Sequence, residues 1–225
     1  MIEDAIQPSE SFVGEYQIVS GRTPDGRNYT GTMTLERRGK FLHAAAALDV
    51  LGPRHGLALP FAGRLVMAFG PKDKVEIGAY TLVGDELTGL WVPPGASDED
   101  FTKCGNERSR RSGAPNTFEI QKAHSIDGSA YHGKVVIAPV ENPASSARPL
   151  TASAPRPVRF TWNLHDGDYH SFGLAYADAI FTTFSFEPDK PHGIAVYEPA
   201  SGGDLMGTLI DKAALTVWTE VLRRR

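Results

Sequence analysis

The sequence predicts an all-β protein made of two tandem repeats of about eight antiparallel strands, each repeat closing into an up-and-down barrel. One observation is a duplication, since Asp-Gly-Arg-Asn-Tyr-Thr-Gly at 25–31 recurs as Asp-Gly-Ser-Ala-Tyr-His-Gly at 127–133. A second is the alternation of apolar and polar residues with a period of two, which is typical of half-buried strands. A third is the absence of long stretches with helical periodicity. Two copies of one β-unit therefore fill the chain.

The first copy begins with a hairpin. Apolar residues alternate with polar ones from Phe12 to Val19 and again from Tyr29 to Glu36, and Thr23-Pro24-Asp25-Gly26 between them is a turn signal. Six further strands follow between Gly and Pro breaks. We place them at Lys40–Val50, Gly56–Phe61, Arg64–Phe69, Lys74–Val83, Glu86–Val92 and Asp100–Arg110.

The second copy repeats this order. Its strands are expected at Asn116–Ser125, Ser129–Val140, Val158–His165, Tyr169–Tyr176, Ile180–Phe186, Gly193–Glu198, Asp204–Ile210 and Leu215–Leu222. The residues Glu141–Pro157 are rich in Pro, Ala and Ser and predict a surface loop inserted in this copy. We therefore expect two domains, a first barrel at residues 1–112 and a second at 113–225.

The run Ala44–Ala47 has high helix propensity, but we assign it to a strand. The preceding Phe41-Leu42-His43 aligns with Phe160-Thr161-Trp162 of the second copy, where residues typical of strands dominate. In this alignment His43 replaces Trp162, and the odd-numbered residues of the segment face inward. We therefore expect the roomier and more polar interior in the first copy.

Eight antiparallel strands close most economically into a barrel, because a closed barrel has no exposed edge. The pattern of turn and packing residues comprises Tyr16-x-Ile18, Pro24-Asp25-Gly26-x-x-Tyr29-x-Gly31, Ile77-x-x-Tyr80 and Leu87-x-Gly89-x-Trp91. Over both halves it resembles the duplicated lipocalin-like or avidin-like, calycin-type barrel domains of uncharacterised bacterial proteins. The resemblance implies a calycin-like barrel that binds a small, largely apolar molecule.

Interiors of small barrels are either filled by side chains or hold one ligand, and ligand pockets combine aromatic walls with a few polar groups. The candidate ligand-binding residues are the inward aromatic and imidazole side chains. They are Tyr16, Tyr29, His43, Tyr80, Trp91 and Trp162. Packing roles compete with binding roles for the tyrosines, because Tyr29 and Tyr131 recur in both copies. Glu107 and Glu220 also recur and are expected to join strands by hydrogen bonds at the barrel rim.

Composition excludes several functional classes. The formal charge of −4 and the isoelectric point near 6.0 leave no basic face for nucleic acid. The single cysteine, the acidic N-terminal segment and the lack of a long apolar run predict a cytoplasmic protein without a membrane span. Neither a nucleophile elbow nor a Gly-rich phosphate loop occurs, and no cofactor is expected. A homodimer remains open.

The segment His165-Asp166-Gly167-Asp168-Tyr169-His170 contains four ligand types for metals. However, Asp-Gly-Asp between two strands indicates a turn, which places both histidines at strand ends facing solvent. We therefore expect no metal site.

Three functional hypotheses follow. The leading one is binding or sequestration of a small hydrophobic or aromatic ligand. The alternative is a cofactor-independent isomerase, cyclase or hydrolase, with His43 as acid or base and Tyr29 or Tyr80 as hydrogen-bond donor. The third is an interaction module that engages a partner through the loop Glu141–Pro157.

Overall fold

The computed structural model describes residues 6, 9–39, 41–70, 74–93, 104–140, 155–185, 187 and 189–225. These residues form sixteen strands and two short 3-10 segments, η2 (Ser9–Ser11) and η4 (Ser201–Gly203). The strands of the first half are β1 (Gly14–Arg22), β2 (Asn28–Arg38), β3 (Phe41–Leu48), β4 (Gly52–Phe61), β5 (Arg64–Phe69), β6 (Val75–Val83), β7 (Glu86–Val92) and β8 (Gly105–Arg111). Those of the second half are β9 (Thr117–His124), β10 (Gly133–Pro139), β11 (Arg156–Leu164), β12 (Gly167–Ala175), β13 (Ala179–Ser185), β14 (Gly193–Pro199), β15 (Leu205–Asp211) and β16 (Trp218–Arg224).

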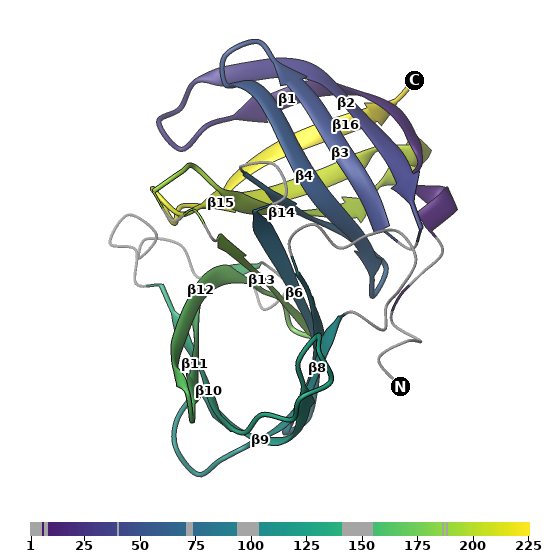
Figure 1. The fold of residues 1–225 in the computed structure, drawn as a ribbon. Helices are drawn as coiled ribbons and strands as arrows, with labels where there is room; N and C mark the ends of the chain where they lie inside the picture. The colour runs from purple at the N-terminus through teal and green to yellow at the C-terminus, as the bar shows by residue number, and fades with distance from the viewer. Residues whose placement is uncertain are drawn as a thin grey trace.

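The strands form two closed antiparallel barrels of eight strands each, which confirms the predicted fold class. The first barrel has the order β1-β16-β15-β14-β5-β4-β3-β2, and the second has the order β10-β11-β12-β13-β6-β7-β8-β9. In Figure 1 the first barrel lies above the second, which is seen as an open ring. The predicted loop Glu141–Pro157 lies mostly outside the described residues, and its last two residues already belong to β11.

The sequence repeats and the barrels do not coincide. The second barrel is built from the consecutive strands β6 to β13, and the first from the flanking strands β1 to β5 and β14 to β16. Each half therefore contributes five strands to one barrel and its last three to the other. The expected division, with one barrel in residues 1–112 and one in 113–225, is corrected accordingly. The cause is that β5 pairs with β14, and β6 with β13, rather than with strands of their own half.

The chain crosses between the barrels twice, after β5 and before β14. The two crossings meet where Gly70 lies against Val75 and His192. The space at Gly70 is so restricted that a Cβ atom there would lie 2.9 Å from the Cβ of His192. The strand exchange therefore places Gly70, which follows β5, beside His192, which precedes β14.

A continuous apolar layer joins the two barrels. Outward-facing residues of β4, β5 and β14 pack against those of β6, β7, β12 and β13. At its centre the rings of Phe61 and Phe181 meet edge to face with centroids 6.0 Å apart. At the rim Arg64 bonds Asp178 at 3.0 Å and Glu198 at 3.1 Å. The same guanidinium lies 4.6 Å above the ring of Tyr176, so charge and aromatic contacts border the apolar layer.

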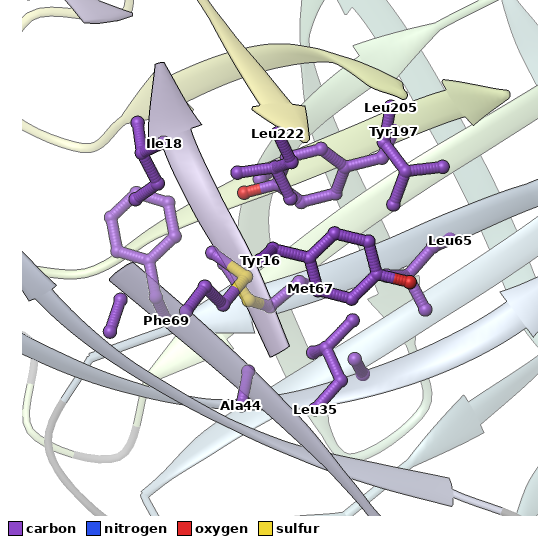
Figure 2. Packing of buried hydrophobic residues seen from close by; sticks show 14 of the residues in the cluster. Tyr16, Ile18, Leu35, Ala44, Leu65, Met67, Phe69, Tyr197, Leu205 and Leu222 are labelled. Carbon is purple, nitrogen blue, oxygen red and sulfur yellow. The ribbon is translucent and has the colours of Figure 1, made fainter. Parts of the chain in front are cut away.

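The interior of the first barrel is filled by side chains. Figure 2 shows the rings of Tyr16, Phe69 and Tyr197 gathered there with aliphatic residues and Met67. At one end of the barrel Phe12 is buried, and its carbonyl accepts a hydrogen bond of 2.9 Å from the Tyr16 hydroxyl. An interior packed in this way is a core rather than an empty container.

The direction of the β3 side chains differs from the prediction. Ala44 and Ala46 face the first-barrel interior with Leu42 and Leu48, because Ala46 pairs with Met33 and Ala44 with Leu35. His43 points outward, where its ring stacks on that of His55 with centroids 6.1 Å apart. The alignment of Phe41 with Phe160 caused the error. By strand register Phe160 pairs with Ile137 as Ala44 pairs with Leu35, so Phe160 corresponds to Ala44.

Phe61 tests whether the apolar layer couples the barrels. Replacing its fully buried side chain by Ala in Phe61→Ala should cost about 3–5 kcal/mol of unfolding free energy. Both barrels should be destabilised in one transition, since each takes three strands from the other half. Urea unfolding followed by tryptophan fluorescence and circular dichroism measures this, with Val83→Ala, at a position 75% exposed, as the control. Two separate transitions would contradict the coupling.

Candidate functional site

Each barrel contains a row of five residues on adjacent strands in which two tyrosines flank one glutamate. In the first barrel the register places them side by side in the order Tyr197, Gly207, Glu220, Gly21 and Tyr29. The glycines are required because each tyrosine ring lies flat over its neighbour, and a Cβ at Gly21 would overlap the ring of Tyr29. We call this arrangement the first-barrel row.

The first-barrel row is fully hydrogen-bonded. The hydroxyls of Tyr29 and Tyr197 each donate to one oxygen of Glu220 at 2.5 Å. Burial, and then the charge of Glu220, raise the pKa of Tyr29 above its usual range. Arg54 lies close enough to act in the opposite direction on the pKa of both Tyr29 and Tyr197. This row is a closed network that joins strands from both halves of the chain.

The second barrel contains the equivalent row, Tyr80, Gly89, Glu107, Ala123 and Tyr131. We call it the second-barrel row. The Tyr131 hydroxyl donates to Oε2 of Glu107 over 3.2 Å, a longer bond than either in the first barrel. The Tyr80 hydroxyl is fully buried and has no hydrogen-bond partner among the described residues. The second-barrel row therefore has the same arrangement of tyrosines, glutamate and small residues, but one of its tyrosine hydroxyls is unpaired.

The Glu107 carboxyl also accepts hydrogen bonds from side chains outside the row. The indole N–H of Trp162 donates to Oε2 at 3.1 Å, and the Ser109 hydroxyl donates to Oε1 at 2.8 Å. Trp91 adds a bond of 3.3 Å from its indole N–H to the Tyr131 hydroxyl. Burial raises the pKa of Glu107, while its hydrogen bonds from Ser109, Tyr131 and Trp162 act to lower it. The carboxyl group is thus held by three side chains, two of them aromatic, and Trp91 in turn holds one of these.

A second acid lies on the same interior face. Glu76 alternates along β6 with Val75 and Ile77, which pack between the barrels, and therefore shares the inward face with Tyr80. Burial raises the pKa of Glu76 to about 8. Its charge also contributes to the raised pKa of Tyr80 and of Tyr131, where burial and Glu107 are the larger causes. Glu76 is thus near the second-barrel row, and its raised pKa favours the protonated, neutral form.

The Ser171 hydroxyl is also buried without a partner among the described residues. Ser171 pairs with Phe160, whose ring packs inside the barrel against Tyr80 with centroids 5.2 Å apart and against Trp162 at 4.5 Å. Buried polar groups are normally hydrogen-bonded, and leaving one unpaired costs about 1–3 kcal/mol. The second barrel therefore places two unpartnered hydroxyls and two carboxyl groups among aromatic rings.

The structure divides the predicted site residues between three places. It brings Tyr80, Trp91 and Trp162 together in the second barrel. Tyr16 and Tyr29 lie in the first barrel, where each hydroxyl is bonded within the protein. His43 lies outside it, so the acid–base role expected for His43 inside the barrel does not match its position.

The expectation of a more polar interior in the first copy is also corrected. The strand exchange moves Trp91 and Glu107 into the second barrel, where they join Trp162. Sequence reasoning did not identify Glu76, Ser109 or Ser171. A signal was present for Glu76, since a period of two places it on the face of Tyr80. No comparable signal marks Ser171, because serine is frequent on both faces of strands.

No protein-family model matches the chain, and comparisons with curated proteins and with solved structures gave no match. Within the described ranges no three or more His, Cys, Asp or Glu side chains are grouped to hold a metal ion. The same ranges contain no helix with the length and apolar character needed to cross a membrane. The candidate site therefore depends on the geometry of the second barrel alone.

The two rows offer a matched pair of substitutions. Tyr197→Phe removes a bond to buried Glu220 and should cost about 1.5–3 kcal/mol of unfolding free energy. Tyr80→Phe removes a hydroxyl without a partner and should be neutral or slightly stabilising. Urea unfolding of the two variants beside the wild type measures both values, and equal losses would show that the Tyr80 hydroxyl is bonded within the protein.

Glu76 predicts a pH dependence of stability. Its pKa rises from 4.5 to about 8 on folding, so the folded state binds the proton more tightly. The contribution of protonated Glu76 to the free energy of unfolding is therefore complete below pH 4.5. It is lost as the pH rises toward 8, by up to about 1.4 kcal/mol per pH unit. Glu76→Gln should flatten this decline in urea unfolding between pH 5 and 8. The exposed Glu119→Gln should leave it unchanged, and parallel profiles for wild type and Glu76→Gln would refute the assignment.

Proposed function

We propose that the protein binds a small, largely aromatic molecule inside the second barrel, as expected for a calycin-type barrel domain. The observation that carries this proposal is the buried Glu107 network in an aromatic wall that also holds the unpartnered hydroxyls of Tyr80 and Ser171. Ligand sites typically combine apolar and aromatic walls with a few convergent polar groups. A bound molecule would provide the hydrogen bonds that these two hydroxyls lack.

The contrast between the barrels supports the choice of the second. In the first barrel, Glu220 is bonded by two tyrosines, and the surrounding interior is packed with large side chains (Figure 2). The corresponding tyrosine in the second barrel has no partner. Because the rows are equivalent in register, the unpaired tyrosine hydroxyl is specific to the second barrel, whereas the unpaired group of the first-barrel interior is the indole N–H of Trp218. Cytoplasmic binding or sequestration is the role that fits the sequence.

The test uses the uncharged aromatic probe N-phenyl-1-naphthylamine with the Trp218→Phe variant, which leaves the chain's other two tryptophans, Trp91 and Trp162, in the second barrel. Binding should quench their fluorescence by energy transfer to the probe. Ser171→Leu fills the second-barrel interior and should weaken binding at least tenfold, whereas Ala46→Leu in the first barrel should leave it within about twofold. Both variants must first show cooperative thermal unfolding.

Native mass spectrometry of the purified protein, compared with the denatured sample, provides an independent measurement. A stoichiometric extra mass that is lost on denaturation, and is reduced in Ser171→Leu, is the expected result. Equal effects of Ser171→Leu and Ala46→Leu on the probe, or binding that leaves both second-barrel tryptophans unaffected, would overturn the proposal.

A further inference from the structure

We infer that the ligand of the second barrel carries a protonated amine, held by Glu76 and Glu107 beside an aromatic group. This inference rests on the proposed function and names the chemical class of its ligand. Its basis is the set of polar groups in the interior, which contains two acids on one face together with unpartnered hydroxyl groups.

The described residues provide no counter-ion for these acids. Arginine ion pairs in the described chain use other carboxylates, all at the surface or at the rim between the barrels. The groups that act on the Glu107 carboxyl are Ser109, Tyr131 and Trp162, which are neutral donors. For Glu76, no described residue adds to the effect of burial on its pKa. A cation entering this interior therefore meets two acids that no arginine or lysine of the described chain neutralises.

The first barrel shows how the same position is arranged when no such ligand is needed. By the alignment of Ile77 and Tyr80 with Ile194 and Tyr197, Glu76 corresponds to Gly193. The ring of Phe69 covers Gly193, and the guanidinium of Arg54 lies 4.6 Å above that ring. The first barrel thus contains its own cation and one acid, while the second contains two acids and an aromatic wall.

The polar groups of the second barrel match the donors of an ammonium group. An ammonium has three N–H donors, and the site offers carboxylate oxygens of Glu76 and Glu107 as well as the oxygens of two buried hydroxyls. The Tyr80 hydroxyl provides the independent observation, because it is fully buried with no described partner at hydrogen-bonding distance, and the charges of Glu107 and Glu76 both raise its pKa. Trp162 acts on the pKa of this hydroxyl in the opposite direction, as the smallest of the causes. The rings of Trp91 and Trp162 can then hold the aromatic part and stabilise the cation through their faces.

An anionic ligand is disfavoured at this site. An anion would receive no compensating charge from a described basic side chain, and any ionised carboxyl group of the site would repel it. A neutral aromatic alcohol would satisfy the hydroxyls but would leave the second acid without a cation. A protonated alkylamine that also carries an aromatic group is therefore the ligand class that uses every polar group of the site.

Three probes of one shape separate these classes by isothermal titration calorimetry at pH 7. They are 2-phenylethylamine, 2-phenylethanol and 3-phenylpropionate, which are cationic, neutral and anionic. The amine should bind at least tenfold more tightly than the alcohol, and the anion should not bind. Because ammonium binding ionises neutral Glu76, its proton passes to the buffer. The heats measured in phosphate and in Tris should accordingly differ by nearly the difference between the ionisation enthalpies of the two buffers. This corresponds to nearly one proton released per amine bound.

Glu76→Gln should abolish the preference for the amine and the proton release, while the affinity for 2-phenylethanol changes by no more than a few fold. Glu119→Gln, on the exposed side of β9, is the matched control and should behave as the wild type. Glu76→Gln removes an acid whose ionisation opposes folding, so it should fold at least as well as the wild type.

The outcomes distinguish the inference from the proposed function. Alcohol binding as tight as amine binding, or an amine preference that persists in Glu76→Gln, would overturn the inference and leave aromatic binding in the second barrel standing. If neither the amine, the alcohol nor N-phenyl-1-naphthylamine binds, both are overturned.

Discussion

The rest of the structure depends on two ladders of backbone hydrogen bonds, between β5 and β14 and between β6 and β13. The first pairs Leu65–Phe69 with Gly193–Tyr197, and the second pairs Val75–Thr81 with Ala179–Ser185. Without them each half would present unpaired strand edges, which favour association with other chains. By exchanging three strands the two halves close both barrels at once. The exchange also explains why the apolar layer between the barrels is continuous, since the strands of both ladders and their neighbours form it.

The same ladders assemble the buried glutamate networks. In the first-barrel row Tyr29 comes from the first half, while Glu220 and Tyr197 come from the second. In the second-barrel row the origins are reversed, because Tyr80 and Glu107 come from the first half and Tyr131 from the second. Each network therefore joins the two halves, and a buried carboxylate that depends on donors from both disfavours their separation. The recurrent glutamates thus connect strands across the exchange, and not only along one rim.

The sequence was sufficient to predict the strands but not their assignment to barrels. Alternation with a period of two and the Gly-Pro breaks are local properties, and they located all sixteen strands and the β1–β2 hairpin within a few residues. The partner of β5 is a long-range choice between β6 and β14, and the two repeats are similar enough that both satisfy the local pattern. The predicted inward direction of the His43 side chain was wrong for a related reason. A three-residue shift between the copies reverses the face of a strand, and only the pairing of Leu35 with Ala44 fixes it.

The two interiors share the residues that close each barrel and differ at positions that closure leaves free. Both barrels keep the tyrosines, the glutamate and the small residues between them, because these groups fit together around the closed sheet. Where the first barrel has Gly193 under Phe69 and Arg54, the second has Glu76. An acid at this position makes folding less favourable as the pH rises, so packing and hydrogen bonding alone do not account for its presence. Residues that oppose stability are expected at functional sites, and Glu76 with the open Tyr80 hydroxyl meets that description in the second barrel only.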